Sequence, residues 1–180
     1  LEVLPLTHIR GRSLHDAFVI VDEAHEYKND EVVSGIEGLA KVKPKIAAVD
    51  LPSIDGSPDI VTVRAGEYSA STTTPIAQLE AIRQALVNNG FLSHGRASDT
   101  VPSRAGHGSD RITELFERSQ MVGDQEQYAS AYALMARSLG YPARVVMGFA
   151  PEIVDGQSST PVTGNDVTVW TEVAFDGVGW

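Results

Sequence analysis

Four residues that could bind a metal ion lie in a short stretch of the sequence, namely His94, Asp99, His107 and Asp110. Imidazole and carboxylate groups are common ligands of zinc and other divalent cations. The spacing of these four residues, however, matches no compact zinc pattern. The surrounding sequence is rich in Gly, Ser and basic residues, which is typical of a solvated loop. We therefore predict no metal site and no bound cofactor.

Covalent catalysis would need an activated nucleophile, and the sequence offers few. The chain contains no cysteine, which excludes a thiol nucleophile, a disulfide bond and a zinc ion held by thiolates. Ser130 carries a hydroxyl group, but no histidine follows His107 that could act as its base. We interpret Ser130 as a small packing residue. The residue types therefore argue against covalent catalysis.

A helix expected from Asp124 to about Leu139 would position any site in the second half of the chain. Asp124 is a favourable N-cap, and Gln127 three residues later completes a pattern typical of a capping box. Gly140 and Pro142 end the helix, because proline cannot continue it. The predicted buried face contains Tyr128, Ala131, Tyr132, Met135 and Leu139, with small residues at Ala129 and Ala136.

Further helices and two strands are expected around this element. Helices are predicted over residues 58–69, 74–90 and from residue 109 onward. The second of these carries an apolar stripe of Ile76, Leu79, Ile82 and Leu86. Residues 91–108 are expected to form a long ordered loop. Strands are predicted over residues 144–149 and 167–173, with a loop between them, and a short buried strand over residues 18–21.

The composition limits the kinds of partner. The 180 residues are 42% hydrophobic and 21% charged, which is ordinary for a globular protein. The formal net charge of −10 argues against binding to nucleic acid or to an anionic membrane surface. No apolar run approaches the roughly 20 residues of a membrane-spanning helix, so membrane association is expected only through segments outside this chain. The sequence begins with Leu1, and we expect it to be a fragment of a longer protein.

A longer pattern in the second half resembles the core of bacterial transglutaminase-like domains. It comprises residues 123–149 and continues through residues 167–180, and its most specific part is the helix followed by Gly-Tyr-Pro-Ala-Arg at residues 140–144. The likeness covers about residues 74–180. It implies an α+β fold, transglutaminase-like or cysteine-protease-like, with helices packed on a small antiparallel sheet that is C-terminally incomplete in this chain.

The resemblance also implies where a papain-like triad would lie. Members of that family place a Cys at the start of the long helix, a His on the second strand that follows it and an Asp on the next strand. A helix N-terminus lowers the pKa of such a thiol, the His acts as the base, and the Asp orients it. In this sequence Gln125 stands at the position of the Cys, and Thr168 stands at the position of the His, two residues before Trp170. The Asp would fall beyond Trp180. The resemblance therefore implies a domain without catalytic residues.

We accordingly predict a pseudoenzyme that binds a protein or peptide, or that has a structural role in a larger bacterial envelope protein. The candidate binding groove consists of Asp124, Gln125, Tyr128, Thr168 and Trp170. Resemblance to membrane-anchored bacterial relatives implies the extracytoplasmic side of a membrane. The alternative is a transglutaminase- or protease-like enzyme that uses unconventional residues.

A second resemblance lies at the N-terminus. Residues 19–25, Val-Ile-Val-Asp-Glu-Ala-His, are similar to a Walker B strand, in which the Asp holds Mg²⁺ through water and the Glu polarises the attacking water. Residues 1–25 as a whole resemble the same region of PhoH-type ATPases. Phosphate binding, however, needs a glycine-rich loop that ends in Gly-Lys, and the sequence contains no Gly-Lys pair. A fragment of a nucleotide-binding ATPase is therefore the less favoured third hypothesis.

These patterns divide the chain into three parts. Residues 1–50 form an N-terminal segment with the Walker B-like strand. Residues 51–73 form a linker and a short helix, because Pro52, Gly56 and Pro58 are typical of a loop. Residues 74–180 form the transglutaminase-like core.

Overall fold

The computed structural model describes residues 45–96, 98–151, 159–177 and 179–180. The strand predicted over residues 18–21, and with it most of the N-terminal segment, lies outside the described residues. The larger of two compact units comprises Val33–Gly148 and Thr168–Trp180. The elements are α2 (Asp59–Ser69), α3 (Pro75–Asn89), β1 (Gly90–Leu92), α4 (Ser109–Glu117), β2 (Met121–Gly123), α5 (Gln125–Ser138), β3 (Ala143–Phe149) and β4 (Val167–Val173).

The four predicted helices are confirmed, and the capping interactions and the buried apolar faces expected from the sequence are observed. In α3, the Thr74 hydroxyl accepts a hydrogen bond from the Ala77 N–H at 3.4 Å, and Pro75 occupies the first turn, where its missing N–H costs nothing. The whole apolar stripe predicted for this helix is buried. In α5, Asp124 and Gln127 form the predicted capping box. The predicted helix over residues 58–69 is α2, and its Val61 is fully buried.

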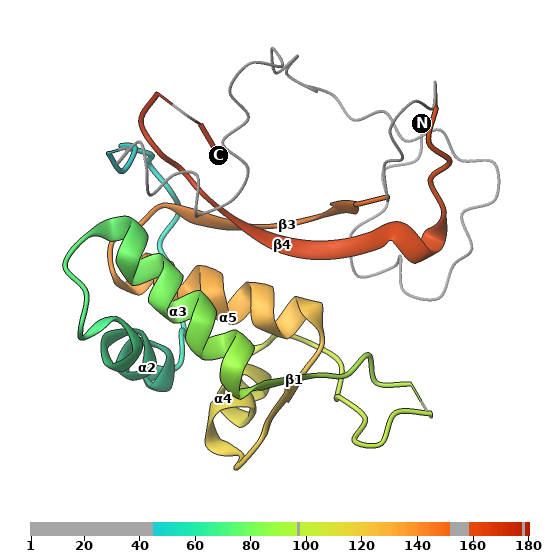
Figure 1. Ribbon diagram of the computed structural model, residues 1–180. Helices are drawn as coiled ribbons and strands as arrows, with labels where there is room; N and C mark the ends of the chain where they lie inside the picture. Colours follow the sequence, from blue (N-terminus) through green and yellow to red (C-terminus); the bar gives the residue numbers. More distant parts are fainter. Residues whose placement is uncertain (1–44, 97, 152–158, 178) are drawn as a thin grey trace. The chain divides into compact units, whose positions relative to one another are not determined.

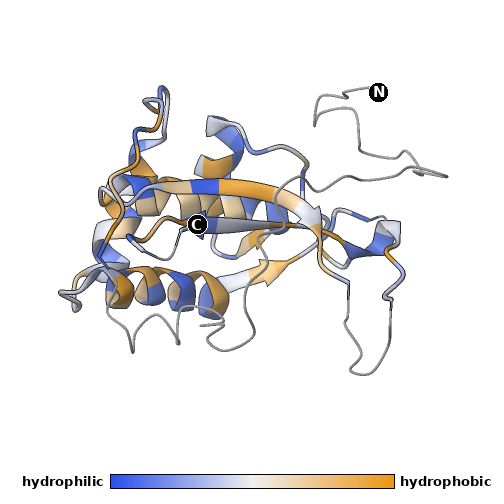
Figure 2. Cartoon of the chain, turned by 90° about the horizontal axis from the view of Figure 1, so that it is seen from above, coloured by the Kyte–Doolittle hydropathy of each residue, from blue (hydrophilic) through white to orange (hydrophobic). Residues whose placement is uncertain are grey.

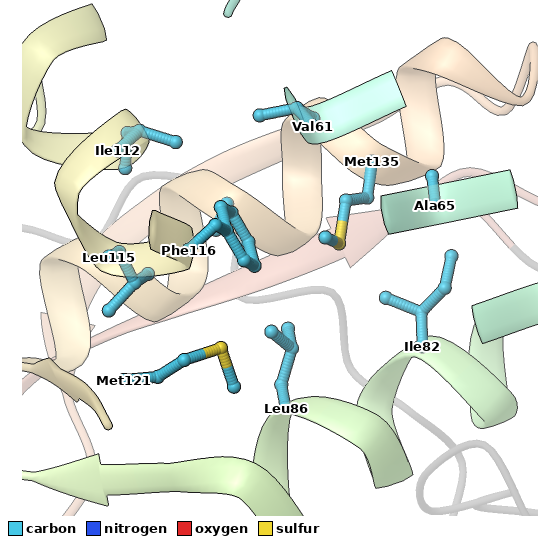
Figure 3. Packing of buried hydrophobic residues seen from close by; sticks show 10 residues of the cluster. Val61, Ala65, Ile82, Leu86, Ile112, Leu115, Phe116, Met121 and Met135 are labelled. Atoms are coloured by element: carbon cyan, nitrogen blue, oxygen red, sulfur yellow. The ribbon is translucent and has the colours of Figure 1, made fainter. Parts of the chain in front are cut away.

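The main core lies where the four helices meet. Figure 3 shows its side chains converging from α2, α3, α4, α5 and β2. Its buried members are Val61, Ala65, Ile82, Leu86, Ile112, Leu115, Phe116, Met121, Ala131 and Met135. The presence of Val61 and Ala65 means that α2 contributes to the same core as the later helices. The predicted domain boundary at residue 74 stays a prediction.

Strands β3 and β4 pair with each other, as predicted, and run antiparallel. The Ala174 N–H donates to the Pro142 carbonyl at 3.0 Å near one end, and Arg144 forms an ion pair with Glu172 one step further along. Towards the other end, the Trp170 ring lies so close to Gly148 that a Cβ there would be 2.7 Å from it. The α+β fold with a small antiparallel sheet is thus confirmed.

A second small sheet was not predicted. Strands β1 and β2 pair in parallel, with Gly90 opposite Met121 and Leu92 opposite Gly123. Both strands are too short to show an alternating pattern. The sequence therefore predicts a loop over residues 91–108 and no element around residue 121. Because β1 follows α3 directly and β2 precedes α5, this sheet ties the start of α5 to the end of α3.

The layers of the larger unit are visible in Figure 1. The β3–β4 pair covers one side of α3 and α5, and α2 and α4 lie on the other side. Figure 2 shows alternating apolar and polar bands on the helix that leads into β1, as expected for a helix with one buried face. In the described part of the chain, no helix combines the length and the apolar character needed to cross a membrane.

The second unit contains Phe149–Val167. Within its described part, the Ala150 N–H donates to the Asp166 carbonyl at 2.8 Å. The short 3₁₀ helix η2 (Gly164–Asp166) is capped by Thr163, whose hydroxyl accepts from the Asn165 N–H at 3.3 Å. The predicted loop before β4 therefore ends in a single capped turn.

Removal of a core side chain should test the packing. We expect Ile82→Ala to lower the free energy of unfolding by about 2–5 kcal/mol, because it leaves a cavity among fully buried neighbours. The control is Val63→Ala on α2, where the side chain is 52% exposed and a change within about 0.5 kcal/mol is expected. Urea unfolding followed by circular dichroism measures both, and equal effects would contradict the assignment of the core.

Candidate functional site

The start of α5 is fixed by its capping residue. The Asp124 carboxylate accepts hydrogen bonds from the Gln125 N–H at 2.7 Å and from His94 Nδ1 at 2.9 Å. The Gln127 side chain in turn accepts from the Asp124 N–H at 2.6 Å. The backbone therefore presents Gln125 as the first residue of the helix, at the end where free N–H groups and the positive end of the helix dipole lie.

The carboxamide of Gln127 is fully buried and joins the helix to the loop before α4. Its Nε2 donates to the Gly106 carbonyl at 2.5 Å and to the Glu126 carboxylate at 2.8 Å. Glu126 also accepts from the Gly106 N–H at 2.7 Å. These bonds hold the loop around residue 106 against the first turn of α5, because a buried carboxamide without partners would be destabilising.

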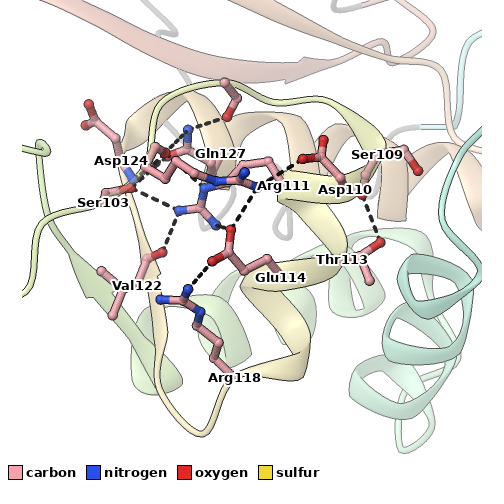
Figure 4. A network of polar contacts seen from close by, with 12 residues as sticks. Ser103, Ser109, Asp110, Arg111, Thr113, Glu114, Arg118, Val122, Asp124 and Gln127 are labelled. Atoms are coloured by element: carbon pink, nitrogen blue, oxygen red, sulfur yellow. Dashed lines mark hydrogen bonds and ion pairs between the residues drawn. The ribbon is translucent and has the colours of Figure 1, made fainter.

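Arg111 secures the same loop from the other side (Figure 4). This almost completely buried side chain donates to the Arg104 carbonyl at 2.9 Å, to Ser103 Oγ at 3.0 Å and to the Val122 carbonyl at 2.7 Å. Burial lowers the pKa of the Arg111 guanidinium from its ordinary value, and Glu114 nearby acts in the opposite direction. The guanidinium stays charged at neutral pH and cross-links loop, helix and β2.

Tyr128, one turn into α5, bridges the two strands of the small sheet. Its hydroxyl accepts from the Phe91 N–H at 2.9 Å and donates to the Met121 carbonyl at 2.5 Å. The ring packs so closely on Gly90 that a Cβ there would lie 2.8 Å from the hydroxyl oxygen, which explains glycine at this position. Burial raises the pKa of Tyr128.

A groove of about 860 Å³ opens beside these residues. Its lining comes from one face of α3, from Leu92 of β1, from the first turns of α5, and from β4 with the turn that follows it. The lining residues are Leu79, Arg83, Leu86, Val87, Gly90, Leu92, Gln125, Tyr128, Ala129, Tyr132, Val169, Trp170, Thr171, Glu172, Val173, Phe175, Gly179 and Trp180. The walls are mainly aliphatic and aromatic, and the volume is in the range of small-molecule and peptide sites.

The groove contains few groups that could transfer a proton. Two charged residues line it, and both form ion pairs: Arg83 with Glu80 at 2.8 Å, and Glu172 with Arg144 at 2.7 Å. The other oxygen of Glu172 accepts from Trp170 Nε1 at 3.0 Å. Burial raises the pKa values of Tyr128 and Tyr132, so both phenols stay neutral near pH 7. No histidine lines the groove in the part of the chain that is described.

The structure brings together three of the five residues predicted for the groove. Gln125, Tyr128 and Trp170 line it, whereas Asp124 and Thr168 do not. Asp124 is occupied as the cap of α5. Thr168 lies in β4, on the same face as Trp170 by the alternation of strand side chains. The roles predicted for these five residues, as vacated catalytic positions or as binding residues, stay predictions. A groove does connect the tip of α5 to β4.

The four residues considered as metal ligands serve separate partners. His94 contacts Asp124, the His107 ring lies 3.9 Å from the Glu126 carboxylate, and Asp110 forms an ion pair with Arg104 at 3.0 Å. Asp99 accepts from Ser93 Oγ and from the Arg96 N–H, each at 3.0 Å, and the backbone N–H of Arg96 is the main reason why the pKa of Asp99 is lowered. Within the described residues, no group of three or more His, Asp or Glu side chains is placed to hold a metal ion.

Several residues that build the site were not found by sequence reasoning. The capping pattern predicted the role of Gln127 at the helix start but not its burial. The burial of Arg111 was not predicted, because an arginine in a polar sequence is normally exposed. The contribution of Leu92 to the groove depends on β1, whose pairing with β2 leaves no pattern in so short a sequence.

The comparisons with known proteins agree with this architecture. Residues 64–180 match the family model of the Transglutaminase-like superfamily. This match covers more than half of the chain, and the chain therefore belongs to that superfamily. The transglutaminase-like resemblance found in the sequence is thereby confirmed.

Two crystal structures show the same fold. The periplasmic domain of TgpA from Pseudomonas aeruginosa is 25% identical, with a TM-score of 0.54, over 73% of this chain and 42% of that chain. The same domain bound to ethylmercury gives 25% identity and a TM-score of 0.53, over 73% of this chain and 44% of that chain. This chain therefore spans less than half the length of these structural relatives.

The N-terminal part is similar to a different family. Residues 1–88 match the family model of PhoH-like protein. Over 39 residues the chain is 62% identical to Protein PhoH2 of Mycolicibacterium smegmatis (strain ATCC 700084 / mc(2)155), which is 22% of this chain and 9% of that protein. These matches confirm that the N-terminal part of the chain resembles PhoH-type proteins. The match to PhoH2 covers only 9% of that protein.

The buried carboxamide should be essential for the stability of the site. We expect Gln127→Ala to lower the free energy of unfolding by about 2–3 kcal/mol, because it removes the capping box and leaves buried loop carbonyls without donors. The control is Gln125→Ala at the neighbouring half-buried position, for which a change within about 0.5 kcal/mol is expected. Chemical denaturation of the two variants measures this, and equal stabilities would contradict the role of Gln127.

Proposed function

We propose that this chain is a non-catalytic transglutaminase-like domain that binds a protein or peptide in the groove between β4 and the helices α3 and α5. The observation that carries the proposal is the residue at the tip of α5. Gln125 lines the groove at the first helical position, where the family places a thiol, and the whole chain contains no cysteine. An uncharged amide gains little nucleophilic character from the helix dipole, because it has no proton that is lost near neutral pH.

The surroundings of Gln125 support binding over chemistry. A nucleophile needs a base within hydrogen-bond reach, and the groove offers two half-buried phenols and two residues held in ion pairs. The histidine that contacts the start of α5 is His94, whose Nδ1 is hydrogen-bonded to the Asp124 carboxylate. This contact stabilises the helix start, and His94 is not among the residues that line the groove.

The apolar walls support a peptide as the ligand. Leu92 and Val87 line the groove with exposed fractions of 55% and 62%. Exposed apolar side chains beside a concave surface are typical of binding sites, because their burial on complex formation is favourable. Aromatic residues at the groove, such as Tyr128 and Trp170, are enriched among binding hot spots for the same reason.

The similarity to a periplasmic domain supports an extracytoplasmic location in a bacterial envelope. A binding domain of this kind would be attached to the membrane through segments other than the helices described here. This part of the proposal is tested by expressing the full-length protein with a reporter fused to the domain and measuring protease accessibility of the domain in intact spheroplasts. Protection from added protease would contradict the location.

Assays of the chain for transamidation should be negative. We expect no conjugate when the chain is incubated with a primary amine and a glutamine-containing peptide, because neither a thiolate nor its base is present. Mass spectrometry of the peptide measures this. Conjugation that persists through repurification and disappears in Gln125→Ala would show that the domain is an enzyme.

Selection from a random peptide library should identify ligands of the groove. We expect enriched peptides to be apolar and their affinity to fall by about tenfold or more in Leu92→Glu, which places a charge in the groove. The matched control is Val63→Glu, on a similarly exposed residue of α2 outside the groove, which should leave the affinity unchanged. Equal loss in both variants, or no enrichment, would overturn the binding proposal.

A further inference from the structure

We propose that Asn89 is a site of spontaneous covalent modification, at which the side-chain amide becomes a carboxylate and part of the product has an isoaspartate backbone. The residue is followed by Gly90, and this Asn–Gly pair occurs once in the sequence. The reaction needs only water as a co-reactant. The site lies at the junction of α3 and β1, where Gly90 lines the groove.

Asn89 is the last residue of α3 and is exposed to solvent. Its side-chain Nδ2 donates to the Ala85 carbonyl at 2.7 Å, and the Gly90 N–H donates to the Leu86 carbonyl as the cap of the helix. Hydrogen bonds in the last turn of a helix open readily, because no further turn holds them. The Gly90 nitrogen therefore reaches the Asn89 carboxamide without unfolding of the core.

The reaction begins when the backbone nitrogen of Gly90 attacks the side-chain carbonyl carbon of Asn89. A carbon–nitrogen bond forms and closes a five-membered succinimide ring, and the side-chain nitrogen leaves as ammonia with the proton of the Gly90 amide. Water then adds to one of the two ring carbonyls and opens the ring. Opening at the side-chain carbonyl gives aspartate, whereas opening at the main-chain carbonyl gives isoaspartate, in which the chain continues through the side-chain carbon. The sum of the steps is the hydrolysis of one amide, with no change of oxidation state.

The residue after Asn89 controls the rate, and the packing requires glycine there. A side chain on the attacking residue hinders ring closure, and Gly90 has no Cβ. A Cβ at this position would collide with the Leu86 carbonyl oxygen and would lie 2.8 Å from the Tyr128 hydroxyl oxygen. The packing of Tyr128 on the small sheet therefore retains the reactive Asn–Gly pair. Asn88 is also exposed, but the residue that follows it carries a side chain.

The isoaspartate product changes the connection between α3 and β1, because it inserts one additional carbon atom into the main chain directly before Gly90. The hydrogen bonds of β1 leave little freedom. The Phe91 N–H donates to the Tyr128 hydroxyl at 2.9 Å, and the Ser93 N–H donates to a carbonyl of β2 at 2.9 Å. The close contact of Gly90 with Tyr128 leaves little space for the extra atom. β1 therefore shifts against β2, and Leu92 moves at the groove.

Both products place a negative charge where the helix does not favour one. A carboxylate at the C-terminal end of α3 meets the negative end of the helix dipole, and it cannot donate to the Ala85 carbonyl as the amide does. The aspartate product keeps the length of the main chain, so β1 and β2 stay in register. The two products therefore separate the effect of the charge from that of the inserted atom.

Peptide mapping after storage tests the reaction. The chain is kept for several weeks at physiological temperature and neutral pH, then unfolded and digested with trypsin, which releases residues 84–96 as one peptide. We expect mass spectrometry to show conversion to the acid at least about tenfold faster at Asn89 than at Asn88, with isoaspartate as the main product. Asn89→Gln should stay unchanged, because it would have to close a six-membered ring. Retention of the Asn89 amide while a sample unfolded in urea is converted, or equal conversion of Asn88, would overturn the proposal.

Hydrogen exchange followed by NMR tests the effect on β1, after ion exchange has separated the modified forms from the intact chain. We expect the amides of Phe91 and Ser93 to exchange at least about tenfold faster in the isoaspartate form than in the intact chain. Asn89→Asp carries the charge without the inserted atom, and this matched control should exchange like the intact chain. Equal exchange in all three forms would overturn the shift of β1.

The effect on ligand binding rests on the proposed function. Library peptides should bind the isoaspartate form at least about tenfold more weakly than they bind Asn89→Asp, because Leu92 lines the groove. Equal affinity would overturn the link between β1 and the ligand. Failure of any peptide to bind would disprove the proposed function, whereas the conversion of Asn89 is measured on the chain alone.

Discussion

The hydrogen bonds of one buried carboxamide determine the geometry of the site. Gln127 caps α5 through the Asp124 N–H and binds the carbonyl of Gly106, so the helix start and the preceding loop cannot move independently. Arg111 reinforces the same junction by bonding to Val122 of β2. These contacts fix the tip of α5 at one end of the groove, and Tyr128, one turn later, fixes the β1–β2 sheet that forms part of its wall.

A rigid helix tip of this kind would suit nucleophilic catalysis, whereas we propose that the tip of α5 in this chain has no catalytic role. Gln125 has no acidic proton, the phenols of the groove are held neutral by burial, and the two charged lining residues are neutralised by their partners. What the groove provides is shape and apolar surface. Under the proposed function, the same architecture that would position a reaction in an enzyme holds a peptide ligand.

Much of the fold could be predicted from the sequence because the helices have strong local signals. The proline after Thr74 and the acidic cap at Asp124 mark helix starts that the structure confirms. Strand β4 was also predicted with its full length. The β1–β2 sheet could not be predicted, because its pairing is between distant segments too short for periodicity. The burial of Gln127 and Arg111 could not be predicted for a related reason. Their polar groups are satisfied by tertiary contacts with a loop, and such contacts leave no local sequence pattern.

The central claim is that the groove binds a peptide without changing it covalently. It is tested most directly by NMR of the chain in complex with a library-selected peptide, recorded over several days in one sample. The account predicts nuclear Overhauser contacts from the peptide to the rings of Tyr128 and Tyr132, with the covalent structure of the peptide unchanged throughout. A peptide that becomes cleaved or conjugated, or whose contacts lie away from these rings, would contradict it.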